Sequence, residues 1–218
     1  MSDPVFEGVY GPFSIDARDR REVLGYRLAL LLAAMAQLAL LAQWQWNGSA
    51  LLWPWLLLLA AGIGLALQWI HIYLRPLHRA LQLLWLLGCL GAGLLAWRAG
   101  PGAMGLAVEQ QHLWVLAIGP LFAALAGIGF KEFFCFRRLE AIGVTLLLPV
   151  ALLGYLAGLL SGPVTLQLLG LESALLLVLC LRKLPMPAAA DVGDKSVFAH
   201  LEALRLQQRG ASVAGPAV

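Results

Sequence analysis

Residues 127–140 read GIGFKEFFCFRRLE and concentrate five charged residues, four phenylalanines and one cysteine between two long apolar runs. Apolar residues make up 61% of the 218-residue chain and charged residues 12%, with a mean hydropathy of +0.82. Soluble domains carry roughly 45–50% apolar and about 25% charged residues. The composition therefore predicts an all-α, polytopic transmembrane helical bundle and excludes a water-soluble fold.

Outward from this stretch, six runs are long and apolar enough to cross a bilayer, which takes about 20 residues. We expect these six spans at residues 23–44, 51–70, 80–97, 112–130, 141–160 and 164–181. The chain is then divided into an N-terminal segment at 1–22, a transmembrane domain at 23–181 and a tail at 182–218.

The basic residues fall almost entirely on one side of these runs. Of the 15 lysines and arginines, only Arg98 follows an odd-numbered run; the others precede the first run, lie in its first turns (Arg27) or follow an even-numbered run. Lys and Arg are retained on the cytoplasmic side of membranes, so we expect both termini in the cytoplasm. The net charge of +3 is thus a signal of topology, and we expect no nucleic-acid partner.

Both polar ends of the chain carry local signals. Residues 9–13 predict a turn, and Ser14 or Asp16 is placed to cap the helix that follows. In the tail, apolar residues recur at helical spacing from Val197 to Leu204, which predicts a short amphipathic helix at 194–208.

Glu172 is the one acidic residue deep inside a predicted span. A charged side chain at the bilayer centre costs about 2.5–3.5 kcal/mol on the insertion scale, so Glu172 is expected to face protein or water. Arg27, near the cytoplasmic end of the first span, is placed to reach partway toward it. Two interpretations follow: a proton or cation site, and a structural hydrogen bond to a neighbouring helix.

The stretch at 127–140 supplies four further candidates, Lys131, Glu132, Cys135 and Glu140. Basic neighbours favour the thiolate form of a cysteine, which makes Cys135 a candidate reactive thiol. The alternative is an interfacial segment that lies flat, with its phenylalanines in the headgroup region.

Small residues recur every fourth position on two consecutive predicted spans, at Gly119, Ala123 and Gly127 and at Gly154 and Gly158. This spacing lets helices approach closely in lipid. We expect the two spans to pack on each other, with a homodimer through one of these faces as the alternative.

No known catalytic motif is present in the sequence, and the three cysteines lack metal-ligand or CxxC spacing. The four histidines lie in connectors or in the tail. We therefore expect no catalytic residue, no cofactor and no metal site, and reduced cysteines.

Several short motifs resemble one known family. They are VYGPF at 9–13, the pairs Asp19-Arg20 and Tyr26-Arg27, and KEFFCF at 131–136 with Glu140. They are similar to an uncharacterised integral-membrane family of cyanobacteria and chloroplasts, catalogued as a domain of unknown function. The resemblance covers residues 5 to about 183. It implies a photosynthetic setting and a thylakoid or plasma membrane. The family has no established activity, so the resemblance assigns no catalytic role to any residue.

Three hypotheses of function remain. The first is a non-enzymatic accessory or assembly protein that contacts a larger membrane complex, or itself, through its small-residue faces. The alternative is a small proton- or cation-coupled transporter or channel that uses Glu172. The third is a membrane thiol enzyme centred on Cys135.

Overall fold

The computed structural model describes residues 4–213, without the side chains of residues 205 and 208–213. These residues form two compact units: a helical bundle at 25–186, and a terminal unit in which residues 4–24 join residues 187–213.

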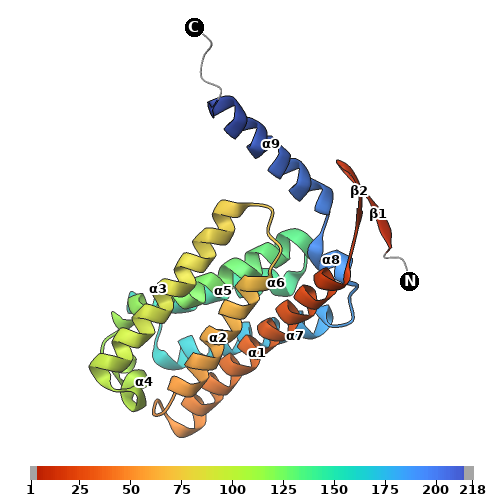
Figure 1. The fold of residues 1–218 in the computed structure, drawn as a ribbon. Coiled ribbons are helices and arrows are strands. Elements are labelled where there is room, and N and C mark those ends of the chain that lie inside the picture. The colour runs from red at the N-terminus through yellow and green to blue at the C-terminus, as the bar shows by residue number, and fades with distance from the viewer. Residues whose placement is uncertain (1–3, 214–218) are drawn as a thin grey trace. The chain divides into compact units, whose positions relative to one another are not determined.

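The bundle consists of helices joined by short connectors (Figure 1). They are α1 (Ala17–Asn47, from Gly25 onward), α2 (Trp53–Trp69), α3 (Arg75–Ala99), α4 (Met104–Gln110), α5 (Trp114–Phe136), α6 (Leu139–Leu156) and α7 (Gly162–Lys183), with a 3-10 turn at Pro101–Ala103. Many leucines on the helix surfaces are exposed, as expected of a surface that faces lipid.

Five described helices, α1, α3, α5, α6 and α7, are long and apolar enough to cross a membrane. The prediction of an all-α membrane protein is confirmed at this level. Helix α2 is apolar but has 17 residues, at the lower limit for a span. It begins late because Gly48 and Leu51 take positive φ angles of 79° and 55° in the preceding turn.

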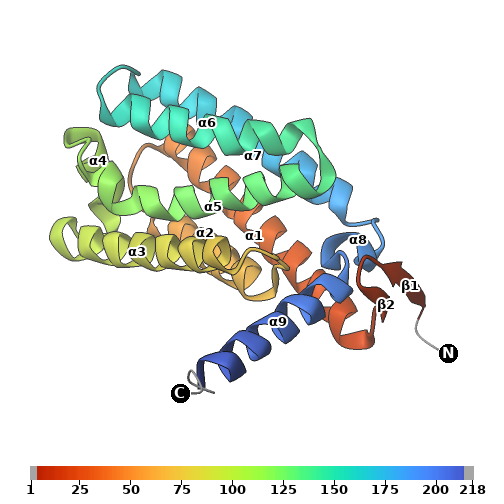
Figure 2. The same cartoon turned by 90° about the horizontal axis from the view of Figure 1, so that it is seen from above.

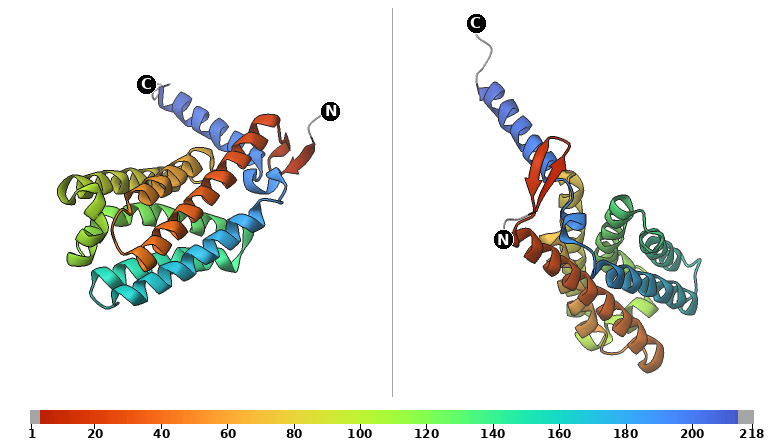
Figure 3. Two further views of the ribbon diagram at one scale, coloured as in Figure 1. Left: turned by 90° about the horizontal axis from the view of Figure 1, so that it is seen from below. Right: turned by 90° about the vertical axis from the view of Figure 1, so that its right-hand side faces the viewer.

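Close helix packing depends on a few glycines. Helices α3 and α5 lie side by side, as do α6 and α7 (Figures 2 and 3). A Cβ atom at Gly91 of α3 would lie 1.9 Å from the carbonyl oxygen of Ala117 on α5. A Cβ at Gly62 of α2 would lie 2.7 Å from the backbone nitrogen of Ala33 on α1. These glycines let the helix backbones touch.

The small residues of α5 and α6 do not face each other as expected. Gly127 faces Leu81 of α3, and Gly154 faces Leu160 just beyond its own helix. Helices α5 and α6 do pack, but at Gly129, where a Cβ would lie 2.9 Å from Val144 Cγ1. Two residues turn a helix by roughly 200°, so Gly127 and Gly129 point to different neighbours.

The terminal unit begins with a hairpin of β1 (Val5–Gly8) and β2 (Gly11–Ser14), in which Phe6 pairs with Phe13. The turn is confined to residues 9 and 10, so most of the predicted turn at 9–13 belongs to β2. The unit also contains the first turns of α1, α8 (Ala188–Val192) and α9 (Lys195–Val213). Helix α9 covers the predicted tail helix and extends five residues beyond it.

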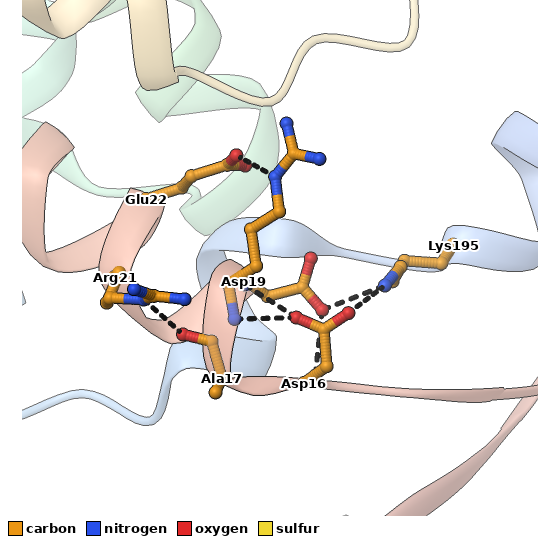
Figure 4. A network of polar contacts seen from close by, with 7 residues as sticks. Asp16, Ala17, Asp19, Arg21, Glu22 and Lys195 are labelled. Carbon is orange, nitrogen blue, oxygen red and sulfur yellow. Dashed lines mark hydrogen bonds and ion pairs between the residues drawn. The ribbon is translucent and has the colours of Figure 1, made fainter.

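Asp16 caps the start of α1. Its Oδ1 accepts hydrogen bonds from the backbone N–H groups of Arg18 and Asp19, at 2.8 and 2.9 Å. These backbone hydrogen bonds, of which the one from the Asp19 N–H has the largest effect, hold the pKa of Asp16 below its usual value of 3.8. Lys195 reaches the same corner and lies 2.8 Å from Asp19 Oδ2 (Figure 4). The start of α1 and the start of α9 are thereby joined within the terminal unit.

Candidate functional site

The buried carboxyl of Glu172 meets an amide of another helix. The Gln37 amide on α1 donates to Glu172 Oε2, and the Ser173 hydroxyl lies 3.4 Å from the same oxygen. The exposed fractions of Gln37 and Glu172 are 1% and 0%. Each residue lies about 15 Å from the nearer end of its helix, at 1.5 Å per residue. The pair is therefore near the middle of an apolar layer about 30 Å thick.

The pair has two acceptors left over. Gln37 Oε1 and Glu172 Oε1 are buried, and neither has a hydrogen-bond partner in the described part of the chain. A buried polar atom without a partner costs about 1–3 kcal/mol. With Glu172 ionised, the amide nitrogen faces the carboxylate, because exchanging the amide oxygen and nitrogen would place two acceptors against each other. A proton on Glu172, or a donor from a ligand, would satisfy these oxygens.

A cavity of about 410 Å³ reaches Gln37. Small-molecule sites usually have volumes of roughly 300–1,000 Å³ and mostly apolar walls. Here the walls are aliphatic and aromatic side chains, among them Leu40, Leu41, Leu56, Leu95, Val115, Ile118, Phe122, Leu152, Leu166 and Leu169. Gln37 is the polar group of this cavity that contacts Glu172.

The other end of the cavity lies at the ends of the helices, where it is lined by Gly48 after α1, Gly105 of α4 and Gly162 at the start of α7. Glu109 of α4 also lines the cavity there. Its Oε1 accepts from Trp44 Nε1 at 2.7 Å, and its Oε2 accepts from the Ser49 hydroxyl at 3.0 Å. These bonds hold α4 against the end of α1, on the side that the charge distribution predicts to be the outer one.

A second polar cluster joins α1, α5 and α7 at the opposite end of the bundle. Glu132 Oε1 accepts from the Tyr26 hydroxyl at 2.6 Å and from Lys131 Nζ at 3.1 Å. Lys183 forms an ion pair with Glu132 Oε2, and its Nζ lies 4.3 Å from the centre of the Phe136 ring. The polar side chains of this cluster are all buried, namely those of Tyr26, Lys131, Glu132 and Lys183.

This cluster corrects the predicted end of the fourth span. Lys131 and Glu132 were expected in a connector after residue 130, but α5 continues to Phe136. The helix continues because the two charges find partners within the bundle. Tyr26 and Lys183 were missed as parts of a site, although their helical spacing from Gln37 and Glu172 was a usable signal.

Arg27 does not take part in the Glu172 site. It donates to the carbonyl oxygens of Leu184 and Met186, at 3.3 and 2.7 Å, just beyond the end of α7. It precedes Gln37 by ten residues, or about 15 Å along α1. Arg27 therefore does not reach toward Glu172 as expected but contacts the carbonyls that follow the C-terminus of α7.

The remaining candidates lie at the corner between α5 and α6. Glu140 pairs with Arg182 at 2.8 Å and with Arg138 at 3.7 Å, which links α6 to α7. Cys135 is a free, exposed cysteine on the last turn of α5. Arg137 ends that helix in the left-handed region, at a φ of 49°. The segment before it is thus helical, where the sequence suggested a flat interfacial segment.

Comparison with known proteins gives a family. The model of a family described as "Uncharacterized integral membrane protein (DUF2301)" matches residues 65–200, more than half of the chain. A protein of Haemophilus influenzae, described as uncharacterized, is 29% identical over 203 residues, which cover 91% of this chain and 99% of that protein. No solved structure matches the chain. The predicted resemblance to an integral-membrane family of unknown function is confirmed.

Proposed function

The chain belongs to the integral membrane protein family DUF2301, and we propose that it is a small transporter or channel that binds a proton or cation at Glu172. One observation carries this proposal: the cavity of about 410 Å³ ends at Gln37, which is hydrogen-bonded to a carboxyl at mid-depth of the bundle. A purely structural hydrogen bond requires no such access.

The free energy of the buried carboxyl supports the same proposal. A charge at this depth costs about 2.5–3.5 kcal/mol, and a bound proton or cation removes that cost. The cavity brings the solute to Gln37, and Gln37 connects it to Glu172. Release on the other side requires α1 and α7 to separate where Tyr26, Glu132 and Lys183 meet.

This transport path assumes a topology that we also propose. Helix α2 crosses the membrane as a sixth span, which puts both termini in the cytoplasm and the open end of the cavity outside. The distribution of lysine and arginine supports this arrangement. The membrane is the plasma membrane, or a thylakoid membrane where the host has one. Labelling of cysteines introduced one at a time into each connector of intact cells tests the count and the orientation.

Proton or cation flux into liposomes tests the function. The purified chain is reconstituted, and a pH-sensitive dye in the lumen follows proton entry while the inorganic cation outside is varied. We expect flux with the native chain and at least a tenfold loss in Glu172→Gln, which keeps the hydrogen bond to Gln37 but cannot ionise. Glu202→Gln is the matched control, because Glu202 is exposed on α9. Absence of flux above empty liposomes, or full flux in Glu172→Gln, contradicts the proposal.

A second candidate is the accessory or assembly protein for a larger membrane complex. It is favoured by α3, whose leucines at 83, 86, 87, 90 and 94 are exposed. This face suits either lipid or an apolar helix of a partner. Gly88, Gly91 and Gly127 are occupied inside the bundle, so they do not supply a face for self-association. Affinity purification in mild detergent tests this role, and recovery of the chain alone as a monomer contradicts it.

A further inference from the structure

The cavity walls narrow the class of solute. Besides Gln37, its polar lining includes Thr165, whose hydroxyl donates to the Ser161 carbonyl at 3.0 Å, and Glu109 at the open end. A bare inorganic cation such as Ca²⁺ takes six to eight oxygen ligands, and an apolar wall supplies none. A proton alone does not need a cavity of about 410 Å³. The walls instead suit a solute with an apolar body.

The inner end of the cavity, at Gln37, indicates which polar head group such a solute would carry. The Gln37 amide nitrogen is engaged by Glu172, which leaves the Gln37 oxygen as a buried acceptor without a partner in the described residues, on a residue that lines the inner end of the cavity. A carboxyl lies directly behind it. A complementary head group therefore donates hydrogen bonds and carries positive charge, as an ammonium group does with its three N–H donors. An anionic head group would face two further acceptors and be excluded.

The open end of the cavity also favours a positively charged solute. Trp44, Trp53 and Tyr155 line the cavity there, together with the Glu109 carboxyl. Aromatic faces attract ammonium groups, and the attraction increases where water is excluded. A cation thus meets favourable groups at the entrance and at the inner end.

We propose that the cavity binds a compound with an apolar body and a protonated amine, whose N–H donates to Gln37 Oε1 and whose charge is balanced by Glu172. This inference rests on the proposed function, because it names the solute class of the same site.

Calorimetric titration of the full chain in lipid nanodiscs tests the inference, with empty nanodiscs subtracted. The probes are n-hexylammonium chloride, 1-hexanol as the neutral compound of the same length, and sodium chloride. We expect hexylammonium to bind at least tenfold more tightly than hexanol, and sodium to bind not at all. Gln37→Leu and Glu172→Gln should each abolish the preference for the amine. Gln167→Leu, the same change at an exposed position of α7, should keep it.

Leu56→Phe provides a check that does not alter the polar pair. Leu56 lines the cavity, so the larger ring should weaken the binding of hexylammonium and hexanol together, at least threefold. Equal affinities for hexanol and hexylammonium, or no binding of either, overturn the inference. If the amine fails to bind while liposomes still show flux that depends on Glu172, the inference fails and the proposed function stands. If the amine binds but no flux is found in liposomes even with hexylammonium outside, the proposed function fails.

Discussion

Replacing Gly91 by alanine tests the close contact between α3 and α5. The new Cβ would lie 1.9 Å from the carbonyl oxygen of Ala117, whereas real Cβ contacts are essentially never shorter than 3.0 Å. The helices α3 and α5 must therefore separate by about 1.1 Å at this point, because the Cβ is attached to the backbone of α3 and the oxygen belongs to the backbone of α5, and both helices are rigid. Overpacking of this kind costs about 1–3 kcal/mol.

Gly93→Ala is the matched control, two residues further along α3. A Cβ at Gly93 meets no atom within 4 Å, so the alanine gains helix propensity of about 0.5–1 kcal/mol without a clash. Thermal unfolding in mild detergent, followed by circular dichroism, gives the comparison. We expect Gly91→Ala to unfold roughly 2–12 °C below the native chain, at about 2–4 °C per kcal/mol, and Gly93→Ala at or above it. Equal midpoints for the two variants would refute the packing of α3 on α5.

Three further outcomes are expected. Glu132→Gln should lower the free energy of unfolding by about 3–5 kcal/mol in the same assay, because it leaves buried ammonium groups without their carboxylate, and an unchanged midpoint would disprove the buried cluster. Hydrogen bonds from the Ser196 hydroxyl, first, and from the Val9 N–H hold the pKa of Asp194 below its usual 3.8. The bond between Val9 and the Asp194 carboxylate therefore stabilises the hairpin above pH 3.8, and this stabilisation is lost as the pH falls below that value and the carboxylate is protonated. Hydrogen exchange at Val9, corrected for intrinsic rates, should show this loss in the native chain and no pH dependence in Asp194→Asn. A maleimide should label the exposed Cys135 in the folded chain but the buried Cys180 only after denaturation, and equal labelling rates would contradict the placement of α5 and α7.

The helical class and the approximate positions of the long helices were predictable because they depend on composition and length alone. The end of α5 was not. The charges of Lys131 and Glu132 predict the boundary of the span, because an unpaired charge is costly in the apolar layer. Their partners, Tyr26 and Lys183, lie more than 50 residues away in sequence, and only the fold brings them together. Charge marks a boundary only where it has no buried partner.

Gln37 shows a similar limit in the candidate site. Glu172 stands out in the sequence because a carboxyl in an apolar run is costly, and the sequence predicts Arg27 or a group of a neighbouring helix as its partner. An uncharged glutamine in the leucine-rich first span attracts less attention, although it also needs hydrogen-bond partners. The cavity was beyond prediction, because its walls come from several helices and depend on side-chain packing.

The spacing of these polar residues explains how α1 and α7 find their alignment. Tyr26 precedes Gln37 by eleven residues, and Lys183 follows Glu172 by eleven, which is close to three helical turns in each case. The two helices run antiparallel, so Gln37 meets Glu172 while Tyr26 and Lys183 meet at Glu132.

Leucine and alanine surfaces pack almost equally well in several alignments, since lipid is as apolar as the side chains themselves. A slip of one residue along α7 would turn Glu172 by roughly 100° away from Gln37 and leave its carboxyl in the apolar layer. The same slip would remove Lys183 from Glu132. Both polar contacts oppose the same displacement, so a few polar residues select one register for two helices whose apolar surfaces do not. A movement that separates α1 from α7 at the end of the bundle where Tyr26, Glu132 and Lys183 meet must break that contact, and the Gln37–Glu172 pair is then its hinge.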